Sequence, residues 1–119
     1  MKISPIELLF LAGMAIGDGP VLAHHSLNQD FDLMKSITVS GVITRVDWSN
    51  PHVRLYLDTN GLDLSDVMHW QLEMSSPGQL ILHGIRTDNL RRGDRITVTA
   101  HPARHGSNLG YAETVSLAK

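Results

Sequence analysis

The histidines are the residues of this chain with the clearest capacity for chemistry. The sequence contains seven histidines and no cysteine, so a transition-metal site here must be built on imidazole nitrogens. Neutral imidazole is a common protein ligand for copper and zinc. The positions of the histidines therefore matter more than their number.

Two adjacent histidines, His24 and His25, directly follow Ala23. Cleavage after Ala23 would make His24 the first residue, and its α-amine and Nδ1 atom could then chelate one metal ion. A third nitrogen, from His25 with its backbone nitrogen or from an imidazole elsewhere such as His52, would complete a T-shaped copper site. We expect copper as the cofactor and His24, His25 and His52 as the candidate metal ligands. The competing interpretation is a solvated terminus that binds no metal.

Other histidines of the chain favour structural roles. His52 follows the turn formers Asn50-Pro51, where its ring could simply donate to a backbone carbonyl and hold the turn. His69 and Glu73 are four residues apart on one predicted strand, roughly 13 Å at ~3.3 Å per residue, which is too far to share an ion directly. We expect these two side chains to face solvent.

The sequence shows no assembled set of catalytic residues. There is no Gly-x-Ser-x-Gly nucleophile elbow. The carboxylates Asp63 and Asp66 lie in a predicted loop with nothing nearby to raise a pKa. Without a matched acid, base and nucleophile, we expect this protein not to be an enzyme.

The first 23 residues have the layout of a secretory signal peptide. Lys2 precedes an apolar run at residues 8–16, and turn formers lead to Val21-Leu22-Ala23 before the expected cleavage point. The run is about half the ~20 residues that a membrane-spanning helix needs, so we expect no stable membrane anchor after cleavage. The prediction is a signal peptide at 1–23 and one domain at 24–119, periplasmic or secreted. Glu7 and Asp18 count against it, and the alternative is a buried N-terminal helix of a cytosolic protein.

The mature part is predicted to be all-β with one short helix. Alternating apolar and β-branched residues predict strands at 37–48, 52–58, 67–74, 95–100 and 111–117. Ser76 and Pro77 are a typical N-cap and first helical residue, and Gly84 marks the end of that helix. The apolar phase of the first strand changes near Gly41, which predicts a bulge or sharp bend there.

Three strands, a short helix and two further strands, with a bent first strand, are the order of a five-stranded OB-like β-barrel. Another small barrel or an open sandwich of the same strands is the alternative. Trp48, Tyr56 and Trp70 could form a stacking platform on such a barrel, but the tryptophans fit better as core residues. Because the net charge is only −2, the sequence predicts no nucleic-acid partner.

Five ordered blocks carry a family resemblance: Ala23-His24-His25-Ser26, Gly41 with Trp48-Ser49-Asn50-Pro51-His52, the segment 70–77, Leu90-Arg91-Arg92-Gly93-Asp94, and His105-Gly106-Ser107-Asn108. Together they resemble an uncharacterised bacterial family of small exported domains. The resemblance covers nearly all of the mature part. It implies a periplasmic or secreted OB-like domain of unknown function and names no reaction.

The leading functional hypothesis is an exported, non-catalytic binding domain with copper at its new N-terminus. Its partner would then be a small ligand or an unknown envelope protein. The alternative is a structural or protein-interaction module of the cell envelope that holds no metal.

Overall fold

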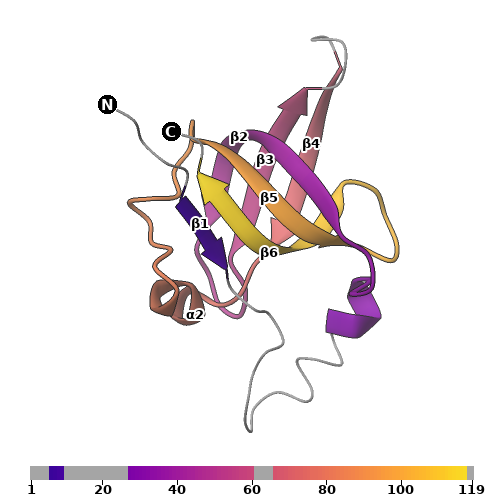
Figure 1. The fold of residues 1–119 in the computed structure, drawn as a ribbon, viewed down its shortest axis with the longest axis horizontal. Coiled ribbons are helices and arrows are strands. Elements are labelled where there is room, and N and C mark those ends of the chain that lie inside the picture. The colour runs from indigo at the N-terminus through magenta and orange to yellow at the C-terminus, as the bar shows by residue number, and fades with distance from the viewer. Residues whose placement is uncertain (1–5, 10–26, 61–65, 118–119) are drawn as a thin grey trace, which may run out of the picture.

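Five strands close into a barrel, as the computed structural model shows for residues 6–9, 27–60 and 66–117 (Figure 1). Around the barrel the strands run β6 (Leu109–Leu117), β4 (Val67–Glu73), β3 (Arg54–Asn60), β2 (Ile37–Asp47) and β5 (Arg95–Pro102). Pairing of β5 with β6 closes the ring. The predicted order of strands around one helix, α2 (Pro77–Leu82), is confirmed.

Strand β2 serves two neighbours, as expected for a bent first strand. Its residues 37–42 pair antiparallel with β5, and its residues 42–47 pair antiparallel with β3. The register with β3 shifts between Ile43 and Arg45. The bulge lets one strand pass from one side of the barrel to the other.

The phase change is located differently from the sequence-based expectation. Val39, Gly41 and Ile43 are all buried, so the alternation runs unbroken through Gly41 and changes only after Ile43. Gly41 is required for another reason. A Cβ at this position would collide with the backbone carbonyl oxygen of Asp58 on β3, so only glycine lets the two strands approach this closely.

The barrel interior is a continuous apolar core. Trp48 and Trp70 are partly buried and pack against it, which agrees with the core role expected for both. Met68, two residues before Trp70 on β4, is exposed near the start of that strand. The fully buried large side chains of the core come from β2, β3, β4 and β5 and from the segments next to them, including α2: Ile43, Val53, Leu55, Leu57, Leu72, Met74, Leu80, Ile85, Leu90, Ile96 and Val98.

The helix α2 begins and ends as its sequence indicates. The hydroxyl oxygen of Ser76 accepts a hydrogen bond from the backbone N–H of Gln79 at 3.2 Å, and Pro77 occupies the first turn. Leu80 is the buried residue of this helix. A second helical turn, at residues 27–30, was not expected from the sequence.

A short strand, β1 (Ile6–Leu9), pairs antiparallel with residues 114–117 of β6. It lies inside the segment that the sequence predicts to be a signal peptide. The cleavage point after Ala23 lies outside the described residues, so the signal peptide and the domain boundary at 23/24 stay predictions. In the described part of the chain, no helix is long and apolar enough to cross a membrane.

Candidate functional site

A histidine and a glutamate meet at one end of the barrel. Nδ1 of His52 lies 2.7 Å from Oε1 of Glu73, and both side chains are about one-third exposed or less. His52 stands just before β3, and Glu73 ends β4. The antiparallel register of β3 with β4 places Arg54 opposite Glu73. His52, two residues before Arg54, therefore lies at the same end of the barrel as Glu73. The alternative expected for His52, a hydrogen bond to a carbonyl of its own turn, is replaced by this pair.

The pair fixes which ring nitrogen of His52 is available. An ionised carboxylate only accepts hydrogen bonds, so Nδ1 carries the proton that His52 donates to Glu73. In the neutral imidazole the lone pair then belongs to Nε2. This carboxylate–histidine arrangement is the one that orients metal-binding histidines in proteins.

Tyr111 lies beneath the pair and links it to the N-terminal part of the domain. Its ring centroid is 6.2 Å from that of His52 and 5.6 Å from that of Phe31, edge-on in both cases. Its hydroxyl lies 3.3 Å from the Ser75 hydroxyl. Burial raises the pKa of the Tyr111 phenol above 10.0, the Ser75 hydrogen bond opposes this, and the negative charge of Glu73 adds to the rise.

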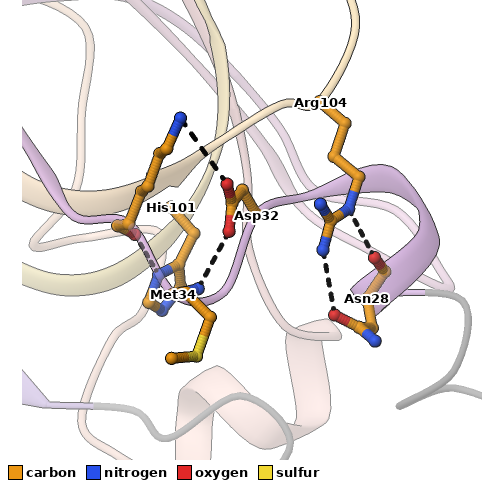
Figure 2. Close-up of polar contacts among 6 residues, drawn as sticks. Asn28, Asp32, Met34, His101 and Arg104 are labelled. Atoms are coloured by element: carbon orange, nitrogen blue, oxygen red, sulfur yellow. Dashed lines mark hydrogen bonds and ion pairs between the residues drawn. The ribbon is translucent and has the colours of Figure 1, made fainter.

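The segment that begins at residue 27 is fastened to the β5–β6 connection (Figure 2). Arg104 donates from Nε to the Asn28 carbonyl oxygen at 2.7 Å and from Nη2 to the Asn28 amide oxygen at 3.2 Å. His101 donates from Nδ1 to the Lys35 carbonyl oxygen at 2.8 Å. Leu27 and Phe31 pack with Tyr111 in a small apolar cluster. The chain just after His24-His25-Ser26 is therefore held beside the His52–Glu73 pair.

A cavity of about 230 Å³ opens next to Glu73. It lies where β4 meets β6, a contact of only three residue pairs, and where the helical turn at 27–30 approaches the β5–β6 connection (Figure 1). Its polar walls come from Asp30, Gln71, Glu73 and His105. Phe31, Ala103, Leu109 and Gly110 complete the lining.

The structure describes only one of the three candidate metal ligands. His24 and His25 lie outside the described residues, whereas His52 is placed at the barrel end. Within residues 6–9, 27–60 and 66–117, no three histidine, aspartate or glutamate side chains come together as a metal-binding group.

Sequence reasoning missed two residues of the site, Glu73 and Tyr111. Glu73 was expected to be a solvent-facing polar position, and Tyr111 only the start of a strand. The β3–β4 hairpin register was the available signal for Glu73, since pairing these two strands brings the end of β4 to the Asn50-Pro51-His52 turn. His69 and Glu73 do not share a site, as expected: Nδ1 of His69 instead lies 2.6 Å from Oδ1 of Asp58.

The fold and the cavity define the class of protein: a small OB-type barrel domain with a cavity beside β4 and β6. Among solved structures it is similar to the mitochondrial single-stranded DNA-binding protein Rim1 from S. cerevisiae, with a TM-score of 0.55 and 12% identity. The likeness covers 76% of this chain and 96% of that one, and it confirms the OB-like fold.

The chain belongs to a family of unknown function, DUF6152, whose model matches residues 13–112. This agrees with the uncharacterised family suggested by the sequence motifs. No curated protein matches the sequence.

The prediction that the protein has no nucleic-acid partner is wrong in the form given above. The similar barrel of Rim1 is that of a single-stranded DNA-binding protein, and the exclusion relied on the net charge of the whole chain. Recognition on a barrel depends on local faces rather than on total charge.

Proposed function

We propose that this protein is an exported, non-catalytic binding domain that holds copper at its mature N-terminus, with His24 as the chelating residue and His52 as an imidazole donor. The family of unknown function and the OB-like fold fit a non-catalytic domain. The observation that carries the copper proposal is the 2.7 Å contact of His52 Nδ1 with Glu73. It leaves Nε2 of His52 as the nitrogen for a metal.

The position of Leu27 supports a role for the residues before it. Leu27 packs with Tyr111, and the Tyr111 ring contacts His52. Three residues span at most roughly 11 Å, so chain length limits how far residue 24 can be from Leu27. His25, one residue closer to Leu27 in the sequence, is the other candidate donor.

The donor set suits copper rather than a hard cation. An α-amine and two or three imidazoles are nitrogen ligands, which favour copper, nickel or zinc over magnesium or calcium. Copper(II) binds such sites most tightly among the divalent first-row metals. When bound, the ion would supply a positive centre at the barrel end, and Glu73 would hold the His52 ring in place.

The test is a copper(II) titration of the exported protein, followed by electron paramagnetic resonance, on a sample whose intact mass gives its N-terminus. We expect a His24 terminus and one tight, nitrogen-ligated site. His24→Ala should remove most of the affinity. His52→Ala should weaken binding and change the nitrogen coupling in the spectrum.

His83→Ala is the matched control, because His83 is an exposed histidine at the end of α2. It should leave copper binding unchanged. A terminus other than His24, or weak copper binding that is insensitive to His24→Ala, would contradict the proposal.

The alternative is a protein-interaction module of the cell envelope. Two large apolar side chains on α2 favour it: Ile81 is 57% exposed and Leu82 is 77% exposed. In that case partner binding should survive His24→Ala and be lost on Ile81→Ser with Leu82→Ser. The same His24 variant therefore separates the two functions.

A further inference from the structure

We propose that the cavity beside Glu73 binds a small organic cation, an amine or guanidinium carried on a short apolar chain. This goes beyond the copper proposal and does not depend on it. The cavity is built entirely from described residues, and its lining includes Glu73 but not His52.

The charge of the lining selects a cation. Asp30 and Glu73 contribute two carboxylates, and Gln71 contributes an amide. Among the described residues that line the cavity there is no lysine or arginine. Arg54 is opposite Glu73 in the β3–β4 register but is not part of the lining. A cation in the cavity would therefore face two carboxylates, and the imidazoles close to them are His105 in the lining and His52 on Glu73.

One wall of the cavity is apolar and rigid. Phe31 is buried and held edge-on against Tyr111, with 5.6 Å between the ring centroids. Leu109 adds an aliphatic surface on β6. An alkyl chain can pack on this wall while its charged end reaches the carboxylates, and an aromatic ring adds a favourable interaction with a nearby cation.

The size of the cavity sets the size of the ligand. At about 230 Å³ it is smaller than the roughly 300–1,000 Å³ that drug-sized ligands occupy. A lysine-like or arginine-like chain suits this volume. The position also fits, because OB barrels bind ligands on the face that includes the loop between the last two strands, and Ala103 and His105 of that loop line the cavity.

Glu73 is prepared for such a ligand by its partner. The contact with His52 at 2.7 Å uses Oε1 and orients the carboxylate. Asp30 lies in the helical turn, where its backbone carbonyl accepts from the Arg104 N–H at 2.9 Å. Among the described residues, no hydrogen bond or ion pair joins Asp30 to His52. Asp30 and Glu73 can thus be changed separately, one without and one with an effect on His52.

The experiment is a nuclear magnetic resonance titration of the metal-free protein with agmatine and, separately, with a neutral-capped Gly-Arg-Gly peptide. We expect saturable shifts of the backbone amides of Gln71, Leu109 and Gly110 with at least one of the two probes. Binding of agmatine alone would identify a free small-molecule cation as the ligand, and binding of the peptide would identify an arginine side chain of a partner protein.

Asp30→Asn and Glu73→Gln should each weaken that binding about tenfold or more, because each removes a charge-assisted hydrogen bond. Asp66→Asn is the matched control. Asp66 is exposed just before β4, at the end opposite to Glu73, and its change should leave the affinity unaltered.

Three results would overturn the proposal: no saturable shifts with either probe, equal affinity in wild type and Asp30→Asn, or shifts at the same amides with a neutral sugar and not with the cations. Because no metal is present and Asp30 does not touch His52, failure here leaves the copper proposal standing. Weak copper binding that is insensitive to His24→Ala would contradict the copper proposal and likewise leave this one standing.

Discussion

At the scale of single residues, Tyr111 connects the His52–Glu73 pair to the segment that begins at residue 27. It contacts His52 on one side and Phe31 on the other, and its hydroxyl reaches Ser75. Its phenol is buried, so the neutral form is favoured and its pKa is raised. The residue therefore couples the packing of the N-terminal segment to the polar pair above it.

This coupling predicts how stability depends on alkaline pH. Above about pH 10 the unfolded chain releases the tyrosine proton before the folded chain does, so the free energy of unfolding falls as the pH rises through that range. Tyr111→Phe should remove this component of the fall. At neutral pH it should cost only about 1 kcal/mol, since the Ser75 contact is a single neutral hydrogen bond.

The measurement is urea unfolding across alkaline pH, combined with phenolate absorbance to follow the titration. In the wild type, the titration step that is lost in Tyr111→Phe should occur above pH 10. If that step lies at or below 10, or if both proteins lose stability equally with pH, the burial argument for Tyr111 fails.

At the scale of elements, strand β2 determines whether the barrel can close. It passes from β5 to β3 within eleven residues, and the close approach at Gly41 leaves no room for a side chain against the Asp58 carbonyl. The glycine is thus needed for strand spacing rather than for an unusual backbone conformation.

Gly41→Ala is therefore expected to destabilise the protein by about 3 kcal/mol, because overpacking here displaces backbone rather than a flexible side chain. The control is Gly78→Ala in α2, where no atom lies within 4 Å of the added Cβ. That change should be neutral or stabilise by up to about 1 kcal/mol. Urea midpoints at constant slope give both values, and similar midpoints for the two variants would refute the spacing argument.

At the scale of the whole molecule, one core supports the entire barrel. Leu72 is completely buried on β4 and sits opposite Gly110 where β4 and β6 meet. Only three residue pairs join these strands, so the closure relies on the packing beneath it. The cavity lies at this same junction, so the packed core also supports the cavity walls.

Leu72→Ala should cost about 2–5 kcal/mol, a large part of the roughly 5–15 kcal/mol that holds a domain folded. Met34→Ala, at a side chain that is 94% exposed, should change stability by less than about 0.5 kcal/mol. Tryptophan fluorescence and far-ultraviolet circular dichroism should report the same transition in each protein. Separate transitions in Leu72→Ala would mean that the barrel is not one cooperative unit.

The elements of this protein are determined by its sequence. The β-branched residues of β2 and the Ser76-Pro77 start of α2 act within a few residues, so alternation and capping could be recognised without knowing what the elements contact. The order of those elements was enough to predict an OB-like barrel. His52 was named from the sequence as a candidate metal ligand, and that role stays a prediction.

The tertiary structure alone decided what surrounds His52. Its pairing with Glu73 depends on the β3–β4 register, and the cavity depends on β4 meeting β6, which are far apart in the chain. The phase change after Ile43 likewise depends on which strand lies alongside. Periodicity shows which side of a strand is apolar, but partner, register and distance of approach are set by packing against distant residues, which no local pattern encodes.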